Sequence, residues 1–464
     1  MTHVAVIGAY GSAGVAVAEH LAGEVDRLTL IDDGEPGGGL CILRGCMPSK
    51  EVLSAAAHRY QARHDHRLDG PLPEVDLDAV VETKNEHTAN FAAHRRAAVH
   101  GMADRGTVEF VHGTARFVDD HTVAVADREI EADYVVVATG SSLNVPAIPG
   151  IEDIGYMSSA DVLDARELPD SGIVVGFGYV GMELAPYIAE AGGTDLTVIE
   201  HDARPLDEAD PAFGGELLDI YREEFDIEIL TETHEERIEP TDDGGIRLHT
   251  DREDDAGTVE AEELFLFTGR RPTLDGVGLD STALDPGPGW VKATMQARDD
   301  PRTFVVGDVN GHEPILHVAK EQGRVAAENI LARERDESLQ AYENVHHHVI
   351  FAGLGVYPYT RVGLSEAAAR EQGIDYVTAT RDAADDGVFK TKDVASGLAK
   401  LLVDAEDGTV LGYQGLHYHA DTMAKTMQVL VENEMDVREV PDRAYHPTLP
   451  EIIDGLLRKT SDRL

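Results

Sequence analysis

The chain has 464 residues, with 87 Asp and Glu against 39 Lys and Arg, and a formal net charge of −48. The acidic residues run along the whole sequence and only nine of the basic residues are Lys, which excludes a basic nucleic-acid surface and a separate acidic tail. We expect the evenly acidic surface of a halophilic protein, because molar salt shortens the screening length to about 3 Å.

The hydrophobic content of 42% is ample for packed cores, and the length predicts two to four domains. The apolar runs stay well below the ~20 residues needed to span a membrane. The N-terminus leads directly into a strand pattern and lacks the basic region and cleavage site of a signal peptide. The sequence therefore predicts a cytoplasmic protein that binds neither membranes nor nucleic acid.

The N-terminal residues predict a dinucleotide-binding fold. A short apolar strand, a glycine turn, a helix and a second strand that ends at Asp32 follow one another within residues 3–32. Gly8, Gly11 and Gly14 have the spacing G-x-x-G-x-x-G, one residue longer than the usual G-x-G-x-x-G. We expect these glycines to admit a pyrophosphate at the helix N-terminus and Asp32 to bind a ribose hydroxyl.

The only two cysteines of the chain, Cys41 and Cys46, stand between a glycine run and Pro48. Two cysteines are too few to staple a chain of this length, and a cytosol keeps most thiols reduced. The close pair therefore predicts a redox-active dithiol, and two unrelated buried cysteines are the alternative. The N-terminus of a helix expected over residues 50–63 would favour the thiolate at Cys46.

Residues 79–105 predict a third helix, in which His94-Arg95-Arg96 is interpreted as a solvated basic face. The β-branched segment 134–138 then predicts a buried strand that ends in the turn Thr139-Gly140.

A second dinucleotide pattern follows, with full G-x-G-x-x-G spacing between a strand and a helix. Its glycines are Gly176, Gly178 and Gly181. The next strand ends at Glu200, an acid that accepts from a ribose 2′-hydroxyl and repels a 2′-phosphate. Glu200 therefore favours NADH, while His201 and Arg204 keep NADPH open. Two nucleotide folds and one dithiol predict a hydride donor and a flavin acting in series.

A later strand ends in a turn that contains Gly269 and repeats the Thr-Gly pair of the turn Thr139-Gly140. A further strand ends at Gly307-Asp308, and a helix over 317–331 is expected after it. Residues 342–464 then change to alternating strands with helices near 365–372 and 421–433, which predicts a third, α+β unit.

Histidines supply the remaining candidates. His446 precedes a proline, and Glu451 follows five residues later, so the two are candidates for an oriented acid–base pair, with a surface-loop histidine as the alternative. His346-His347-His348, and His417 with His419, lack the cysteine or carboxylate spacing of a metal motif, so no metal site is predicted.

Together these features resemble the flavin-dependent pyridine nucleotide–disulfide oxidoreductases, which include glutathione reductase, dihydrolipoamide dehydrogenase, mercuric reductase and mycothione reductase. The segments that carry the resemblance, in the family's order, are 38–41, 46–50, 138–140, 176–183, 307–308, 446–448 and Glu451. One departure is Leu43, where the family usually has Asn.

The resemblance implies an α/β fold with two Rossmann-type domains, for FAD and NAD(P), and a C-terminal α+β dimerisation domain. It implies an FAD-binding domain over 1–150 and 271–340, an NAD(P)-binding domain over 151–270 and a dimerisation domain over 341–464. An obligate homodimer follows from it.

The resemblance also implies the roles of the site residues. NAD(P)H would reduce FAD, which would reduce a Cys41–Cys46 disulfide. Cys46 would be the thiolate facing the flavin, and Cys41 would attack the substrate disulfide. His446 of the partner subunit, oriented by Glu451, would be the acid–base.

The cofactor-binding residues that the resemblance implies lie in the two glycine turns and around the flavin. They are Gly8, Gly11, Gly14, Asp32, Lys50, Thr139, Gly140, Gly176, Gly178, Tyr179, Gly181, Glu183, Glu200, Gly269, Gly307 and Asp308. Tyr179 would shield the nicotinamide pocket, and the pair of Lys50 and Glu183 would lie near the reactive flavin nitrogen.

The residues that bear on the substrate class resemble different members of the family. Tyr179 is similar to glutathione reductase, whereas Glu200 and the His446 motif resemble dihydrolipoamide dehydrogenase, and the C-terminus lacks the cysteines of mercuric reductase. Combined with the acidic composition, the resemblance favours reduction of bis-γ-glutamylcystine, with NADPH expected, and dihydrolipoamide dehydrogenase is the alternative. Arg44 would attract a substrate carboxylate or face solvent, and the long segment 351–363 would alter an interface or a substrate mouth.

Overall fold

The computed structural model describes residues 1–104, 106–252, 255–443 and 445–464, so the predicted helix end at Arg105 lies outside the described residues. The chain folds into two compact units, each built from three separate stretches. Unit 1 comprises Met1–Pro48, Thr83–Asn144 and Arg270–Asn344, and unit 2 comprises Ser49–Glu82, Val145–Gly269 and Val345–Leu464. The described part of the chain contains no helix that is both long and apolar enough to cross a membrane.

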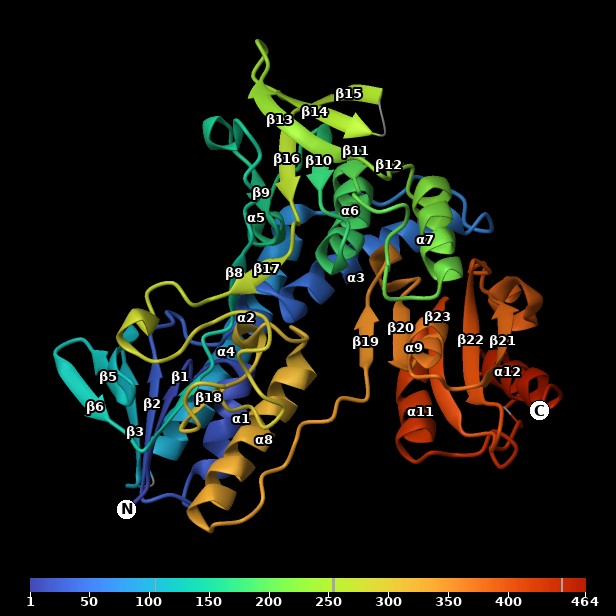
Figure 1. Cartoon of the computed structure of the whole chain (residues 1–464). Coiled ribbons are helices and arrows are strands. Elements are labelled where there is room, and N and C mark those ends of the chain that lie inside the picture. The colour runs from blue at the N-terminus through green and yellow to red at the C-terminus, as the bar shows by residue number, and fades with distance from the viewer. Residues whose placement is uncertain (105, 253–254, 444) are drawn as a thin grey trace. The chain divides into compact units, whose positions relative to one another are not determined.

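Unit 1 is built on a parallel five-stranded sheet in the order β18-β7-β1-β2-β3 (Figure 1). Its strands are β1 (His3–Ile7), β2 (Arg27–Asp32), β3 (Val108–His112), β7 (Tyr134–Val137) and β18 (Thr303–Val305). The strand β7 is a continuous run of buried residues, as expected for a parallel strand covered on both faces. The carboxyl ends of β1, β2, β7 and β18 therefore point to the same edge.

Two long helices, α1 (Ser12–Leu21) and α8 (Leu316–Glu334), lie side by side in unit 1 (Figure 1). The remaining strands of the unit form an antiparallel three-stranded sheet and a two-stranded ribbon. They are β4 (Ala115–Asp119), β5 (Thr122–Val125), β6 (Arg128–Glu131), β8 (Ser141–Leu143) and β17 (Arg270–Pro272). A short helix α2 (Leu40–Arg44) precedes α3 (Cys46–His64), and α3 and α4 (Leu77–Ala103) each run across the boundary between the units.

Unit 2 contains a second parallel sheet, in the order β12-β11-β10-β16-β9. Its strands are β9 (Met157–Ser158), β10 (Ser171–Val175), β11 (Asp195–Ile199), β12 (Glu228–Leu230) and β16 (Glu263–Leu266). The accompanying helices and the antiparallel extension are α5 (Ser159–Asp164), α6 (Tyr179–Gly192), α7 (Pro211–Glu224), β13 (His234–Pro240), β14 (Ile246–Arg252) and β15 (Asp255–Ala261). The two parallel sheets and the helices between their strands confirm the predicted α/β fold.

The C-terminal part of unit 2 is an antiparallel sheet in the order β19-β20-β23-β22-β21. Its strands are β19 (His347–Ile350), β20 (Tyr359–Gly363), β21 (Tyr376–Asp382), β22 (Gly397–Asp404) and β23 (Val410–His417), and its helices are α9 (Glu366–Glu371), α10 (Gly387–Thr391), α11 (Ala420–Glu432) and α12 (Glu451–Ser461). The two predicted helices correspond to α9 and α11. The sequence interpretation was wrong to end with these two helices, since it missed α12. This helix buries four apolar side chains at helical spacing from Ile452 to Leu457.

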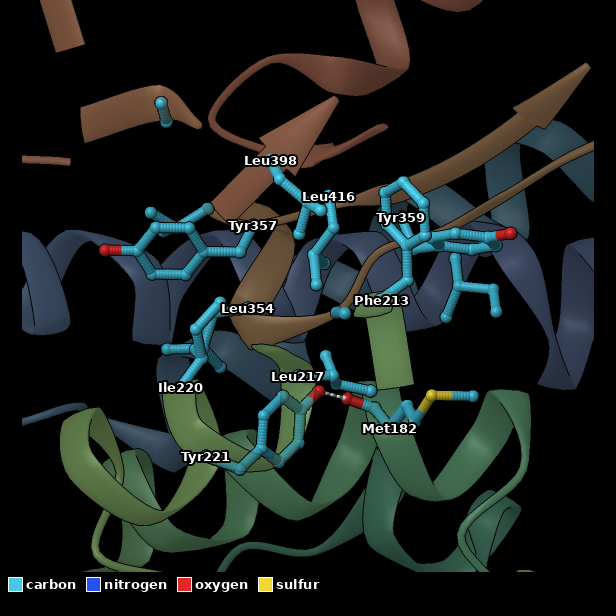
Figure 2. Close-up of a cluster of buried hydrophobic side chains, with 14 of the residues drawn as sticks. Met182, Phe213, Leu217, Ile220, Tyr221, Leu354, Tyr357, Tyr359, Leu398 and Leu416 are labelled. Carbon is cyan, nitrogen blue, oxygen red and sulfur yellow. Dashed lines mark hydrogen bonds between the residues drawn. The ribbon is translucent and has the colours of Figure 1, made fainter. Parts of the chain in front are cut away.

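Figure 2 shows the largest core of unit 2, where aromatic rings from α7 and from the segment 351–363 meet. The Tyr221 hydroxyl donates to the Met182 carbonyl and accepts from the Gly353 amide. Leu354, Tyr357 and Tyr359 are almost fully buried. The long segment 351–363 is therefore a core element of unit 2, held by packing within that unit.

Candidate active site

A cavity of about 520 Å³ opens at the carboxyl edge of the unit 1 sheet. Much of its lining is glycine, so the wall is largely bare backbone. The predicted site residues that line it are Gly8, Gly11, Asp32, Cys41, Cys46, Thr139, Gly140, Gly307 and Asp308. Residues far apart in the sequence thus converge because the parallel strands β1, β2, β7 and β18 all end here.

The unusual first glycine turn is explained by Tyr10. This extra residue is buried, its ring is 5.2 Å from that of Phe110, and its hydroxyl lies 2.6 Å from His100 Nε2. Its backbone amide donates to Asp32 Oδ2 at 2.8 Å. The inserted residue therefore turns into the core of unit 1, and Gly8 and Gly11 still line the cavity.

Asp32 is fixed at the end of β2 by two backbone donors, the amides of Tyr10 and of Gly34, the latter at 2.9 Å. Burial raises the pKa of its carboxyl, and these two hydrogen bonds act in the opposite direction.

The residues fit an FAD. Helix α1 begins after Gly11 without a side-chain cap, so its first amides are available to an anionic group such as a pyrophosphate. Asp32 offers a carboxylate to a ribose one strand away. A Cβ on Gly14 would lie 2.2 Å from the Gly8 carbonyl oxygen, so the close approach of α1 to β1 requires glycine there.

The dithiol lines the same cavity. Cys41 is a half-buried residue of α2, and Cys46 is exposed at the first position of α3. The hydrogen bond with Cys46, followed by burial, raises the pKa of the Cys41 thiol. The proton of the reduced pair is therefore better held at Cys41, and the helix N-terminus favours the thiolate at Cys46.

Helix α4 supports the loops around the dithiol, which corrects the interpretation of residues 94–96 as a solvated face. Arg95 Nη1 donates to the Tyr10 carbonyl at 2.9 Å, and Arg96 Nη1 donates to the Gly37 carbonyl at 3.0 Å. Both guanidinium groups thus bond to loop backbone in unit 1. Arg95 also lowers the pKa of Cys41 through its positive charge, against the larger effects of Cys46 and burial.

The variant Arg95→Gln is expected to slow alkylation of Cys41 about three- to tenfold near neutral pH, because loss of the nearby cation raises the pKa of the thiol. Site-resolved alkylation of the reduced enzyme by iodoacetamide, followed by mass spectrometry across pH, measures this effect. Arg96→Gln is the matched control, since it removes the same charge from the same helix. Equal rates for both variants would contradict a specific effect of Arg95.

A buried amide that the sequence did not predict, Gln322, holds the Gly307-Asp308 part of the cavity lining. Gln322 Oε1 of α8 accepts from the Gly307 amide and from Asn310 Nδ2, both at 2.8 Å. Asp308 Oδ2 accepts from the Ser141 hydroxyl at 2.7 Å. A polar residue on the buried face of an otherwise helical pattern was the available signal for Gln322.

The remaining predicted site residues lie in unit 2. They are Lys50, Gly176, Gly178, Tyr179, Gly181, Glu183, Glu200, Gly269, His446 and Glu451. Gly178 precedes α6, whose first residue, Tyr179, is 41% exposed. The ring of Tyr179 lies 5.5 Å from that of His348. Gly269 occupies the turn between β16 and β17.

Glu200 follows β11 and is buried, which raises the pKa of its carboxyl, and it accepts from the Asp202 amide at 2.9 Å. Its neighbour His201 is engaged elsewhere, with Nε2 2.8 Å from Glu235 Oε2. A carboxylate is thus held at the end of the second strand of this sheet, which is where a ribose-binding acid belongs.

Lys50 and Glu183 form an ion pair in unit 2. Lys50 Nζ donates to both carboxylate oxygens of Glu183, at 2.8 and 2.7 Å. The Phe351 amide donates to the same carboxylate at 3.1 Å, and Lys50 Nζ lies 4.3 Å from the centre of the Phe351 ring. The start of the segment 351–363 therefore holds this pair in place.

His446 and Glu451 are in contact. His446 Nδ1 lies 3.1 Å from each carboxylate oxygen of Glu451, and the Thr448 amide donates to Glu451 Oε1 at 2.8 Å. These bonds lower the pKa of Glu451, the Thr448 amide most strongly. The His446 side chain is 81% exposed in the single chain. A carboxylate thus orients the imidazole of this exposed histidine through Nδ1.

The chain is similar to known proteins over nearly its whole length. Dihydrolipoyl dehydrogenase of Bacillus subtilis is 28% identical over 97% of this chain and 94% of its own length. Dihydrolipoyl dehydrogenase 2 of Haloarcula marismortui is 29% identical over 97% of this chain and 95% of its own length. The fold is similar to that of HOCl-induced flavoprotein disulfide reductase RclA from Escherichia coli, with a TM-score of 0.83, 22% identity and 99% coverage of both chains.

Residues 2–323 match the family described as pyridine nucleotide-disulphide oxidoreductase, and residues 354–456 match the dimerisation domain of the same family. These two matches span most of both units. The chain therefore belongs to the pyridine nucleotide-disulphide oxidoreductases and is an FAD-dependent disulfide oxidoreductase that works with a pyridine nucleotide.

Proposed function

We propose that this enzyme uses NAD(P)H to reduce a low-molecular-weight disulfide, and that the disulfide is bis-γ-glutamylcystine. The observation that carries the proposal is the shared cavity: Cys41 and Cys46 line the same cavity as the glycine turn and Asp32. FAD, when bound, supplies a two-electron carrier between a pyridine nucleotide and a disulfide. The half-buried Cys41 and the exposed Cys46 differ in environment, as two thiols with different tasks should.

The two cysteines divide the exchange between them. Cys41 first gives its proton to the imidazole of His446 of the partner subunit. The resulting Cys41 thiolate attacks one sulfur of the substrate disulfide, a mixed disulfide forms, and the first substrate thiolate leaves. Cys46 then attacks the Cys41 sulfur, which closes the Cys41–Cys46 disulfide and releases the second thiolate. Two electrons pass from the dithiol to the substrate, and each leaving thiolate takes up one proton.

We propose that His446 of the partner subunit supplies the proton to the leaving thiolate. Glu451 holds Nδ1, so Nε2 is the nitrogen that transfers the proton. The 81% exposure of His446 in a single protomer is expected if a second copy completes the site. The proposal thus requires a homodimer, with an FAD-binding domain over 1–150 and 271–340, an NAD(P)-binding domain over 151–270 and a dimerisation domain over 341–464.

A substrate panel in multimolar KCl tests the substrate. Initial rates with bis-γ-glutamylcystine, oxidised glutathione and lipoamide are expected to give at least about a tenfold higher kcat/KM for the first. The variant Arg44→Gln adds a second test, since Arg44 is exposed at the end of α2 between the cysteines. It should raise KM for the anionic disulfide and leave KM for neutral lipoamide unchanged. A clear preference for lipoamide would refute the substrate assignment.

Dihydrolipoamide dehydrogenase is the second candidate, because both curated relatives described above carry that name. Under this alternative lipoamide would be the preferred substrate, and the enzyme would copurify with the acyltransferase core of a 2-oxoacid dehydrogenase complex.

The nucleotide preference is predicted from Glu200. Its buried carboxylate supports NADH, whereas the resemblance to glutathione reductase supports NADPH. Glu200→Gln should shift the ratio of kcat/KM for NADPH over NADH upward about tenfold, because the charge that repels a 2′-phosphate is removed. Asp202→Asn is the matched control, as it neutralises an exposed neighbouring carboxylate. An unchanged ratio in Glu200→Gln would show that this residue does not select the nucleotide.

A further inference from the structure

Two histidines of the run 346–348 share one face of a strand. His348 belongs to β19, His346 immediately precedes it, and side chains two residues apart in an extended chain point the same way. The backbone is fixed at both positions, since Gly363 N donates to the His346 carbonyl at 2.7 Å and His348 is the register partner of Arg361 in β20. His347 points to the opposite face.

A carboxylate from a distant part of unit 2 completes this pair. Glu208, in the segment between β11 and α7, has Oε2 3.4 Å from His346 Nε2. One ligand atom from each of Glu208, His346 and His348 lies within 4.8 Å of the other two. A tetrahedral metal with bonds of about 2.0–2.1 Å separates its ligand atoms by about 3.3 Å, so small side-chain rotations suffice to close the site.

The cluster is open to an ion from solvent and rigid on its inner side. The side chains of Glu208 and His346 are 51% and 23% exposed, whereas His348 is buried, with its ring centre 5.7 Å from that of Tyr359. Glu208 Oε2 and His346 Nε2 already face each other at 3.4 Å, so an entering ion could bind between them. An ionised carboxylate and two imidazoles are ligands that Zn²⁺, Ni²⁺ and Cu²⁺ accept.

Arg361 limits the affinity of such a site. Its Nη1 donates to the Glu208 carbonyl at 3.1 Å and lies 3.6 Å from Glu208 Oε2. This bond positions the segment that carries Glu208, but the positive charge opposes a second cation. We therefore expect dissociation constants of about 1–100 μM, in place of the much tighter binding of a resident structural metal.

We propose that Glu208, His346 and His348 form a binding site for a divalent transition-metal ion that regulates access of the pyridine nucleotide. The link to the nucleotide is Tyr179, the first residue of α6 after the second glycine turn, whose ring lies 5.5 Å from that of His348. An ion on His348 would fix the imidazole that lies beside the Tyr179 ring. This regulatory consequence rests on the proposed role of Tyr179 at the nicotinamide, whereas the metal site itself does not.

Isothermal titration of the oxidised holoenzyme with Ni²⁺ tests the site, because a closed Cys41–Cys46 disulfide removes the thiolates as competing ligands. The titration is run at about pH 8, where imidazoles are neutral, in multimolar KCl to suppress weak binding to surface carboxylates. We expect a single micromolar site in the wild type. His346→Ala and Glu208→Gln should each weaken it at least about tenfold.

His347→Ala is the matched control, because it removes a neighbouring histidine from the opposite strand face and should change the affinity less than about twofold. His346→Ala is preferred to His348→Ala, since the buried His348 packs between two aromatic rings. Absence of the micromolar site, equal loss in His347→Ala, or unchanged binding in both His346→Ala and Glu208→Gln would each overturn the proposal.

The regulatory step has its own measurement. Ni²⁺ should lower the affinity of the oxidised enzyme for the pyridine nucleotide several-fold in the wild type and leave it unchanged in His346→Ala. If the affinity for the pyridine nucleotide is the same with and without bound Ni²⁺, the coupling to Tyr179 is overturned. A failed disulfide substrate panel would not change either titration, so failure of the proposed function and failure of the metal site are distinguishable.

Discussion

Replacement of Cys41 by Ser is expected to lower disulfide turnover by at least about a thousandfold while the protein keeps its flavin. A serine hydroxyl has nearly the volume of the thiol, but it is not ionised near neutral pH and cannot exchange with a disulfide. Cys46 remains at the head of α3, yet without Cys41 it has no partner with which to close a disulfide. Steady-state rates and the flavin absorbance of the dialysed protein measure the two outcomes together.

The control for this variant is Met47→Leu, which changes an exposed side chain next to Cys46 at nearly constant volume and should leave turnover within about twofold. Turnover above about a tenth of the wild-type rate in Cys41→Ser would remove Cys41 from the role of attacking thiol. A protein whose cellular function survives the substitution would instead be a flavoprotein that does not depend on disulfide turnover.

The parts of the fold that the sequence predicted well are those with strong local patterns. The runs at β1, β7, β10 and β18 are apolar, β-branched and followed by glycine turns, and parallel strands buried on both faces require this pattern. Helix α12 was missed because Pro447 and Pro450 precede it closely and Gly455 interrupts it, and these residues usually indicate a loop. Only tertiary packing, which buries Ile452 and Leu456, shows that it is a helix.

Some residues of the candidate site could likewise be predicted from local sequence patterns, and others could not. Cys41, Asp32 and the glycines carry their chemistry in their spacing, so the sequence alone could assemble them. The contributions of Tyr10 and Arg95 depend on a contact between the first glycine turn and α4, residues that are distant in the sequence. A charged residue on a long helix has no local signal that distinguishes a backbone-anchoring arginine from a solvated one.

The cluster of Glu208, His346 and His348 could not be predicted from the spacing of residues in the sequence. His346 and His348 form a His-x-His pair in the sequence, but the third ligand, Glu208, lies in a distant segment and is brought to the pair by the packing of unit 2. Spacing alone therefore offered no reason to predict a metal there, and the proposal depends on the three-dimensional arrangement.

Substitutions in the two glycine turns are expected to have different effects, one on FAD binding and the other on reduction by NAD(P)H. Gly14→Ala should lower the FAD affinity at least about a hundredfold, because its Cβ would lie 2.2 Å from the Gly8 carbonyl oxygen and would force α1 away from β1 at the cavity wall. In the second turn, a Cβ at Gly181 would lie 2.3 Å from the Gly176 carbonyl oxygen. Gly181→Ala should therefore keep its flavin but lose reduction by NAD(P)H.

Flavin retained after gel filtration and the flavin absorbance after addition of NAD(P)H measure these two losses independently. Gly101→Ala is the control for a Gly-to-Ala change in a helix, since a Cβ at Gly101 would point into open space among the described residues, and the substitution should stabilise α4 by up to about 1 kcal/mol. Flavin loss from Gly181→Ala together with flavin retention in Gly14→Ala would reverse the assignment of the two nucleotides. Both substitutions place the same methyl group against the same kind of backbone oxygen. A difference between the two variants in flavin retention and in reduction by NAD(P)H therefore reports which nucleotide each turn binds.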